Sequence, residues 1–261
     1  MSNLNARAAG AGAKGAGKAL VLCSAGLDST YNLLRARTDF KEVQALFVDY
    51  SHKAASQEYL RVKRLCMALK LHFIKIDLPW YRTLNSSLTS SARPVSQFGS
   101  FETISSPSIT GAGAPAGTPG AAQKPSEWVP NRNAVFVNAA AAVAESGGFD
   151  TIVIGINKEE AERYPDNTAE FIHRANSLLE LSTLTKPRVM SYSADMAKPA
   201  IFAHLQPLLK EFNLGKEYIW SCYSSYEKMC GYCESCLRLK HAIRENQKET
   251  EWQELFLKQG I

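Results

Sequence analysis

Short apolar runs alternate with segments of helical periodicity along most of this sequence, and the alternation limits the folds that the chain can adopt. The expected strands are residues 19–23, 43–48, 73–76, 151–155 and 188–192. The expected helices are residues 31–37, 54–71, 134–145, 170–184 and 197–212. Strands that alternate with helices form βαβ units. The sequence therefore predicts an α/β fold with a doubly wound, mostly parallel sheet, and ligands at the carboxyl ends of its strands.

The first expected strand ends in a loop of small residues, 24–30, that opens a helix. Free backbone N–H groups and the positive end of the helix dipole converge on a phosphate in such a loop. The hydroxyls of Ser24, Ser29 and Thr30 add donors, whereas Asp28 requires a cation such as Mg²⁺ between its carboxylate and the phosphate. Taken alone, the loop fits an ordinary βα turn with helix caps equally well.

The second informative segment is a cysteine cluster near the C-terminus. Cys222, Cys230, Cys233 and Cys236 follow one another with spacings of seven, two and two residues. Four thiolates this close complete a closed tetrahedral zinc shell, which predicts a structural site. An iron–sulfur cluster is the alternative, because cysteine sets with two-residue spacings also bind iron. Without a secretion signal, metal binding is favoured over disulfides.

Composition excludes several classes of protein. The 30 Lys and Arg residues exceed the 25 Asp and Glu residues by a net charge of +5. This excess is spread out and suits an anionic nucleotide, so no stable nucleic-acid partner is expected. No run approaches the roughly 20 apolar residues that span a bilayer, and residues 1–17 lack the pattern of a signal peptide. We expect a cytoplasmic protein.

Two segments interrupt the alternation of strands and helices. Residues 86–127 are dominated by Ser, Thr, Ala, Gly and Pro, and we interpret them as a mobile insertion in preference to an active-site lid. Residues 1–17 are expected to form a disordered leader. The predicted organisation is therefore a nucleotide-binding domain at 18–219, which carries the insertion, and a zinc-binding helical tail at 220–261.

The loop is similar to the Ser-Gly-Gly-x-Asp-Ser signature of the PP-loop ATP pyrophosphatases, although Ala25 stands where that group has glycine. Its methyl group is tolerated at negative φ and unfavourable at positive φ. The loop and the cysteine tail together resemble the 7-cyano-7-deazaguanine synthase (QueC) family. Further matching stretches are 47–50, 129–133, 164–166, Lys198, 220–223 and 230–238, and they run in family order.

The resemblance implies a PP-loop fold, also described as adenine nucleotide alpha hydrolase-like. It further implies ATP with Mg²⁺, one structural zinc ion per chain, and a homodimer. The family converts 7-carboxy-7-deazaguanine and ammonia into 7-cyano-7-deazaguanine. The carboxylate is adenylated, ammonia displaces AMP to form an amide, and a second activation dehydrates the amide to the nitrile.

The resemblance also implies roles for individual residues. ATP binds at Cys23, Ser24, Ala25, Gly26, Leu27, Asp28, Ser29, Thr30 and Asp49. The catalytic residues are Asp28, Arg132 and Lys198, and the substrate-binding residues are Asn133, Tyr164 and Asp166. From the residues alone, a solvated helix lysine is the favoured interpretation of Lys198. A helix cap with a surface arginine is the less favoured alternative for residues 132–133, and residues 164–166 taken alone fit a turn.

Several stretches depart from the family pattern. Residues 49–52 read Asp-Tyr-Ser-His where Asp-Tyr-Gly-Gln is common, Asn167 stands where many members have cysteine, and residues 157–161 also differ. These differences concern the half of the site that binds the acceptor. A second hypothesis is therefore a QueC-like ligase that joins a deazapurine acid to an amine of a protein or another molecule. A third is a zinc-containing protein that binds or thiolates tRNA.

Overall fold

A parallel β-sheet forms the centre of the computed structural model, which describes residues 15–105 and 126–257. Within these residues the sheet has five strands in the order β3-β2-β1-β4-β5, and every neighbouring pair is parallel. The strands are β1 (Gly15–Leu22), β2 (Phe40–Asp49), β3 (Phe73–Asp77), β4 (Thr151–Val153) and β5 (Arg188–Met190). The chain builds outward from β1 to β3 and then returns past β1 to β4. The predicted α/β fold with a parallel sheet is confirmed.

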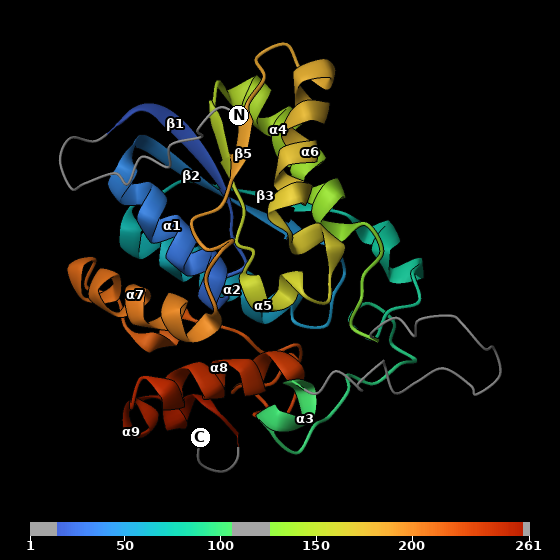
Figure 1. Cartoon of the computed structure of the whole chain (residues 1–261), viewed down its shortest axis with the longest axis vertical. Coiled ribbons are helices and arrows are strands. Elements are labelled where there is room, and N and C mark those ends of the chain that lie inside the picture. The colour runs from blue at the N-terminus through green and yellow to red at the C-terminus, as the bar shows by residue number, and fades with distance from the viewer. Residues whose placement is uncertain (1–14, 106–125, 258–261) are drawn as a thin grey trace, which may run out of the picture.

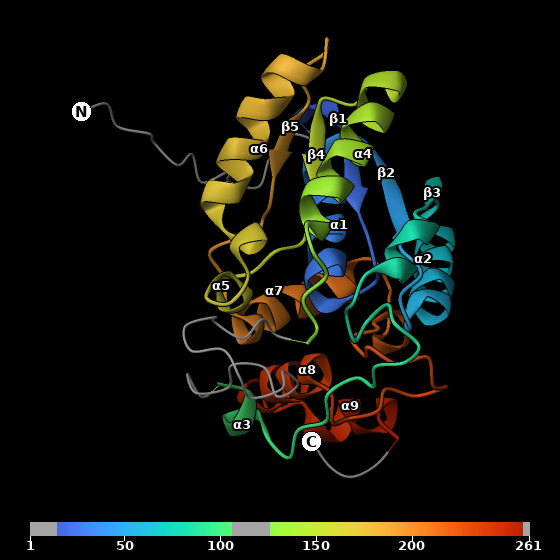
Figure 2. The same ribbon diagram turned by 90° about the vertical axis from the view of Figure 1, so that its right-hand side faces the viewer.

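Helices cover both faces of the sheet. On one face lie α1 (Leu27–Asp39), α2 (Ala55–Leu69) and α7 (Lys198–Glu211), and on the other lie α4 (Arg132–Gly147) and α6 (Ala169–Ser182) (Figures 1 and 2). Alternate residues of β1 enter the two apolar layers, because successive side chains of a strand point to opposite faces. Val21 packs in the layer with α1, α2 and α7, and Leu20 packs in the layer with α4 and α6.

The C-terminal region extends the first of these layers. It contains α8 (Glu234–Glu245) and α9 (Glu249–Trp252), which lie beyond α7 in Figure 1. Trp252 meets Phe202 of α7 edge to face, with 4.8 Å between the ring centroids. The cysteine tail therefore shares the core of the main domain. The shorter elements are α3 (Phe101–Ser105), α5 (Lys158–Ala161), η1 (Pro79–Thr83), η2 (Pro165–Asn167), η3 (Lys216–Tyr218) and η4 (Gln253–Leu255).

Segment boundaries differ from the sequence expectations at a few points. Helix α1 begins at Leu27 instead of residue 31, so part of the small-residue loop forms its first turn. β1 begins at Gly15, inside the expected leader, whereas residues 1–14 lie outside the described part of the chain. β5 ends at Met190, two residues earlier than expected.

The described flanks of the expected insertion pack against the rest of the molecule. Leu88 is buried with Tyr81 and Val129 in a small apolar cluster. Phe101 of α3 stacks on His241 of α8, with 3.8 Å between the ring centroids. These contacts attach residues 86–105 to both the sheet domain and the C-terminal region. Residues 106–125 of the expected insertion lie outside the description.

Candidate functional site

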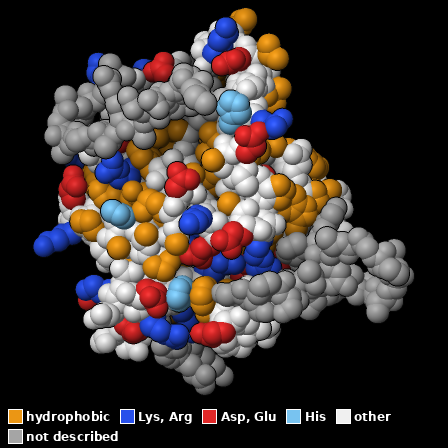
Figure 3. Space-filling view, viewed as in Figure 1, with side chains coloured by type: hydrophobic (Ala, Val, Ile, Leu, Met, Phe, Trp, Pro, Cys, Tyr) orange, Lys and Arg blue, Asp and Glu red, His pale blue; other side chains and the backbone are white. Residues whose placement is uncertain are grey.

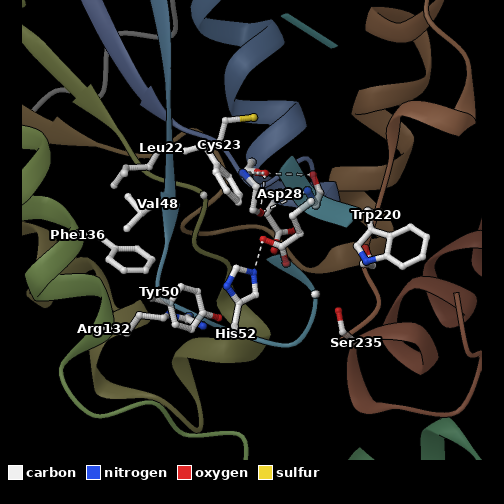
Figure 4. A pocket seen from close by; sticks show the side chains of 18 of the residues that line it. Leu22, Cys23, Asp28, Val48, Tyr50, His52, Arg132, Phe136, Trp220 and Ser235 are labelled. Carbon is white, nitrogen blue, oxygen red and sulfur yellow. Dashed lines mark hydrogen bonds and ion pairs between the residues drawn. The ribbon is translucent and has the colours of Figure 1, made fainter. Parts of the chain in front are cut away.

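A cavity of about 200 Å³ opens at the carboxyl ends of β1 and β2, where ligands bind in sheets of this kind (Figure 4). Its wall combines the loop after β1, the loop after β2, the start of α4 and the segment that follows Ile219. The polar side chains in the wall are Ser24, Asp28, Ser29, Tyr50, His52, Lys53, Glu58, Arg132, Asn133, Glu160, Lys198, Ser221, Tyr223 and Ser235. Segments far apart in the sequence thus converge on one site.

The loop after β1 has the geometry of an anion cradle. The hydroxyl oxygens of Ser24 and Ser29 lie 3.2 Å apart, and the Gly26 N–H donates to Ser24 Oγ at 3.4 Å. The Ala25 carbonyl accepts a hydrogen bond from the Trp220 N–H at 2.8 Å, which ties the loop to the C-terminal region. Because α1 begins at Leu27, its dipole adds positive potential at the same point.

Ala25 adopts a left-handed backbone conformation with φ of 59°. The sequence left open whether residue 25 has negative or positive φ, and the structure shows that it is positive. A residue with a Cβ is destabilised by about 1–2 kcal/mol in this conformation. The side chain is fully buried, so its methyl group contributes packing that partly offsets the strain. The glycine of the PP-loop signature is therefore explained by backbone geometry, and this chain tolerates the strained alternative.

The first turn of α1 is also approached closely by the chain after β4. A Cβ added to Gly155 would lie 2.8 Å from Ser29 N and 2.9 Å from Ser29 Cα. Real Cβ atoms do not approach backbone so closely, so only glycine fits at this point. Sequence reasoning did not single out Gly155, although it follows an apolar strand directly.

A buried ion-pair network lies beside the loop. Lys198 Nζ is 2.8 Å from Asp28 Oδ2 and 3.0 Å from Glu160 Oε1. Asn157 Nδ2 donates to Asp28 Oδ2 at 2.9 Å. Asp28 Oδ1 has no hydrogen-bond partner among the described residues. That oxygen is therefore available to a ligand or to a metal ion.

Electrostatics keep Lys198 and Glu160 of this network charged. Burial opposes the protonated ammonium, yet Asp28 and Glu160 together raise the pKa of Lys198. Burial also opposes ionisation of Glu160, yet Lys198 and Arg238 lower the pKa of that carboxyl to about 2. Burial raises the pKa of Asp28, and Lys198 acts against this rise. Lys198 is only 6% exposed, so its interpretation as a solvated helix lysine is wrong.

The start of α4 supplies a second cation. Arg132 lies above the Tyr50 ring, with 5.9 Å from its guanidinium carbon to the ring centroid. Burial opposes the charge, yet Tyr50 and Asp166 raise the pKa of Arg132. The Asn133 N–H donates to Asp166 Oδ2 at 3.3 Å, and Asn133 Nδ2 donates to the Asp166 carbonyl at 3.0 Å. Asp166 thereby holds the start of α4, where a negative charge is favourable.

The four cysteines of the tail converge on one point. Their sulfur atoms all lie within 4.8 Å of one another, all four residues are buried, and Cys230 and Cys236 have their sulfurs 3.8 Å apart. The Cys222 sulfur also accepts hydrogen bonds from the N–H groups of Ser224 and Cys230, both at 3.3 Å. Sulfurs arranged in this way can bind a metal ion.

Ion pairs connect the cysteine cluster to the cavity. Arg238 of α8 donates to Glu159 Oε2 at 2.8 Å, and the other carboxylate oxygen of Glu159 accepts a hydrogen bond from the Lys198 N–H at 2.8 Å. Glu234, which follows Cys233, is 2.6 Å from Arg163 and 3.0 Å from Arg238. The start of α7 is therefore held in part by residues of the cysteine-rich tail.

The sequence profile of the family described as "Queuosine biosynthesis protein QueC" matches residues 18–247 of this chain. The chain belongs to the QueC family.

Proteins named 7-cyano-7-deazaguanine synthase are its relatives. The one from Bdellovibrio bacteriovorus is 38% identical over 227 residues, which are 87% of this chain and 92% of the relative. The one from Carboxydothermus hydrogenoformans is 36% identical over 229 residues, covering 86% and 97% respectively. A solved 4-thiouridine synthetase–RNA complex with bound ATP aligns at 13% identity with a TM-score of 0.45, covering 89% of this chain and 53% of that chain. In the described residues, no helix has the length and apolar character to cross a membrane.

For this QueC-family chain, the structure brings many of the expected site residues together. Cys23, Ser24, Gly26, Leu27, Asp28, Ser29, Arg132, Asn133 and Lys198 all line the cavity. Ala25 and Thr30 are fully buried behind the loop.

Three expected site residues lie outside the cavity wall. Asp49 accepts a hydrogen bond from the Ser51 N–H at 3.0 Å and pairs with Lys75 at 3.3 Å. Asp166 is occupied by Asn133 as described above. Tyr164 stacks on Trp128, with 5.8 Å between the ring centroids. Asp166 supports the wall through Asn133, whereas the contacts described above for Asp49 and Tyr164 are with residues that do not line the cavity.

Sequence reasoning missed four residues of the site besides Gly155. Asn157 and Glu160 belong to a stretch that was noted only for its departure from the family pattern, and His52 was noted in the same way. Glu58 was read only as part of an amphipathic helix. A signal was nevertheless present for Asn157, Glu160 and His52, because each of them follows a predicted strand within about five positions. Glu58 lies inside a predicted helix, and no such signal marked it.

Proposed function

We propose that this chain converts 7-carboxy-7-deazaguanine and ammonia into 7-cyano-7-deazaguanine with consumption of ATP. The observation that carries the proposal is the buried Asp28–Lys198 pair beside the small-residue loop, in a chain that belongs to the QueC family. A charged pair next to an anion cradle suits a reaction in which pyrophosphate leaves and charge develops on phosphate. The names of the relatives favour the nitrile over the conjugate of the rival ligase.

ATP binding follows from the wall of the cavity. The loop N–H groups and the hydroxyls of Ser24 and Ser29 hold phosphate oxygens, and Lys198 faces the same point. Leu22, Val48 and Phe136 form an apolar part of the wall that suits a flat base (Figure 4). The unpartnered Oδ1 of Asp28 is an oxygen ligand of the kind that Mg²⁺ takes, so the donor set fits this ion. When bound, Mg²⁺ would neutralise charge on the phosphates.

The residues of this chain mainly position the reactants. Lys198 is held by Asp28 and Glu160 and cannot swing away from the phosphate loop. Arg132, held over Tyr50, supplies a permanent cation for the carboxylate or the α-phosphate. The Asn133 side chain reaches the cavity and is our candidate for direct contact with the deazaguanine, whereas Asp166 orients that part of the wall through Asn133. Fixed donors of this kind need no reorganisation during the reaction.

We propose zinc as the metal of the cysteine cluster. Four sulfurs at the usual zinc distance of about 2.3 Å lie about 3.8 Å apart in a tetrahedron, which agrees with the 3.8 Å between Cys230 and Cys236. An iron–sulfur cluster places several atoms between its thiolates and so separates the sulfurs further. The donor set therefore fits one zinc ion per chain with a structural role, since the shell has no open position.

The remaining expectations about partners are also proposals. On the face shown in Figure 3, acidic and basic side chains of the described residues lie next to one another, which does not favour a nucleic-acid surface. We retain the homodimer and the absence of a stable nucleic-acid partner as proposals. We likewise propose that residues 18–219 act as the ATP-binding domain and that the region from residue 220 onward binds the metal.

The test is a product assay with the full chain. The purified protein is incubated with ATP, Mg²⁺, ammonia and 7-carboxy-7-deazaguanine, and the products are identified by mass spectrometry. We expect the nitrile together with AMP and pyrophosphate. Amide without nitrile, or adenylation of the acid followed by transfer only to a larger amine, would support the rival ligase. Tight, salt-dependent tRNA binding without AMP formation would support the third hypothesis.

A further inference from the structure

His52 occupies a position in the cavity that the phosphate chemistry does not use. It follows β2 in the loop that leads to α2, it is 6% exposed, and it lines the cavity. Figure 4 shows its ring pointing from this loop toward the centre of the cavity, on the side that also holds Tyr50 and Arg132. It stands where glutamine is common in the family, so the family pattern does not account for an imidazole here.

Two neighbours, Tyr50 and Glu58, fix the orientation of the imidazole. Its ring is stacked on Tyr50, with 4.0 Å between the centroids and 8° between the planes. Tyr50 is itself held by the rings of Tyr81 at 5.8 Å and Phe136 at 5.4 Å. Ser51 between them has φ of 60°, and this left-handed turn brings the two rings face to face. The ring is thus pre-set before any ligand arrives.

Glu58 of α2 completes the arrangement. Its Oε2 lies 2.9 Å from His52 Nε2, and its side chain is 18% exposed. Nδ1 of His52 has no hydrogen-bond partner among the described residues, and the contact of Nε2 with Glu58 is an ion-pair approach that does not meet hydrogen-bond geometry. A carboxylate beside one ring nitrogen favours a proton on that nitrogen and leaves the other nitrogen with its lone pair. The pair therefore has the form of a base oriented by an acid, with the accepting atom unoccupied.

The charged and titratable groups around the imidazole come from several elements. Besides Glu58 and Tyr50 they are Lys53 in the same loop, whose ammonium donates to the Arg93 carbonyl, Arg132 at the start of α4 beyond Tyr50, and across the cavity Asp28, Glu160 and Lys198. Burial raises the pKa of Tyr50 to about 12, so its phenol stays protonated and cannot replace the imidazole as a base near neutral pH. Lys198 and Arg132 hold their protons. Imidazole is the side chain in this set that normally exchanges a proton near neutral pH.

We propose that His52 accepts the proton that nitrogen loses when ammonia attacks the adenylated acid, with Glu58 as its positioning residue. The inference rests on the proposed function. In this step the nitrogen lone pair forms the C–N bond, the C–O bond to AMP breaks, and AMP leaves with that electron pair. One N–H proton passes to the imidazole, and the product is the amide. The two protons that remain on the amide nitrogen are both lost on the way from the activated amide to the nitrile as the second AMP leaves, and the same base serves this stage after it has returned its first proton to solvent.

The decisive experiment separates adenylation from amide formation in the full, metal-loaded chain. Exchange of labelled pyrophosphate into ATP, dependent on 7-carboxy-7-deazaguanine and without ammonia, reports the first step. A single turnover started with ammonia reports the second. In His52→Gln we expect the exchange rate to stay within about twofold and amide formation to slow by about 100-fold or more. His173→Gln, an exposed histidine on α6, is the matched control and should change neither rate.

The outcomes distinguish the inference from the proposed function. An unchanged amide-forming rate in His52→Gln, or an equal loss in both steps, would overturn the base role and leave a packing role. Absence of exchange and of nitrile in the unaltered protein would instead overturn the proposed function itself. Glu58→Gln should slow amide formation by a smaller factor and again spare exchange.

A measurement on the unaltered chain covers the case in which the variants do not fold. The concentration of free ammonia is held constant while pH is lowered from about 8.5 to 6, across the range in which imidazole gains its proton. We expect the amide-forming rate to fall several-fold, with exchange far less affected. A rate that stays constant at constant free ammonia would overturn the proposal.

Discussion

The cavity and the cysteine cluster differ in how their buried ligand atoms are arranged. In the cavity, Asp28 Oδ1 and His52 Nδ1 have no partner among the described residues, and both residues line an open space. In the cluster, four sulfurs converge within 4.8 Å of one another, and none of the four cysteines belongs to the cavity wall. The first arrangement suits ligands that enter, react and leave. The second suits a permanent ion that stabilises the tail.

The two regions are also coupled. The segment that carries the cysteines contributes Ser221, Tyr223 and Ser235 to the cavity wall. Arg238 and Glu159 connect α8 to the start of α7. Loss of the metal should therefore damage the site, whereas loss of a catalytic group should leave the metal in place. This asymmetry can be tested one residue at a time.

The largest effect is expected for Asp28→Asn. It removes the carboxylate beside the phosphate loop, and we expect AMP release to fall by about 1,000-fold or more. Stability should change little by comparison, because Lys198 keeps Glu160 as its partner at 3.0 Å. The rate of AMP release, the melting temperature and the metal content check this. Loss of bound metal in this variant would contradict the separation of the two sites.

Cys233→Ala should act in the opposite way, through stability. Removing one of four sulfurs opens the shell, and we expect the free energy of unfolding to fall by about 4 kcal/mol, a part of the roughly 10–16 kcal/mol that structural zinc contributes in peptides. Metal analysis and denaturant unfolding measure this. Cys66→Ala is the control, since Cys66 is buried outside the cluster, and one metal ion per chain should remain. Full stability without metal would exclude a structural zinc site.

Arg238→Met tests the coupling between the regions. The buried guanidinium is 2.8 Å from Glu159 and 3.0 Å from Glu234. Its removal should lower the free energy of unfolding by about 3 kcal/mol while the metal stays bound. In the control Arg174→Met, the lost pair with Glu170 is exposed, and the change should be below about 1 kcal/mol. Equal effects of the two substitutions would argue against a coupled structure.

The pH dependence of stability should reflect Glu160. Its pKa is lowered from 4.5 to about 2 in the folded chain, so the stabilisation from its carboxylate is fully present above about pH 4.5 and is lost as pH falls toward 2. Unfolding by urea at pH 5 and pH 3 should therefore show a smaller loss of stability in Glu160→Gln than in the unaltered chain. The exposed Glu170→Gln should behave like the unaltered chain.

The smallest expected effect is a gain in stability in Ala25→Gly. Glycine relieves the strain at φ of 59°, and the lost methyl and the greater freedom of the unfolded chain offset part of the gain. We expect a net stabilisation of about 0.5 kcal/mol, measured by denaturant unfolding. Ala36→Gly removes an equally buried methyl group within α1 and should destabilise by about 1 kcal/mol or more. Destabilisation in both variants would show that packing outweighs strain at Ala25.

The sequence by itself determined the features that depend on neighbours along the chain. Alternating apolar runs and helical periodicity predicted the parallel sheet and its helices, because both patterns follow from the local geometry of the backbone. The cysteine spacings predicted the metal site, because short spacings along the chain allow successive sulfurs to turn onto one ion. The small-residue loop after the first strand predicted the cavity that contains Ser24 and Asp28.

Only the tertiary structure decided how distant segments meet. Lys198 and Asp28 are 170 positions apart, and their contact depends on the return of the chain past β1 to β4 and β5. The same contact explains why a helix lysine is buried. Three further features likewise depend on three-dimensional packing. They are the left-handed conformation of Ala25, the ion pair of Asp49 with Lys75, and the stack of His52 on Tyr50. Local patterns cannot encode these features, because burial and partner choice are set by side chains that arrive from elsewhere in the fold.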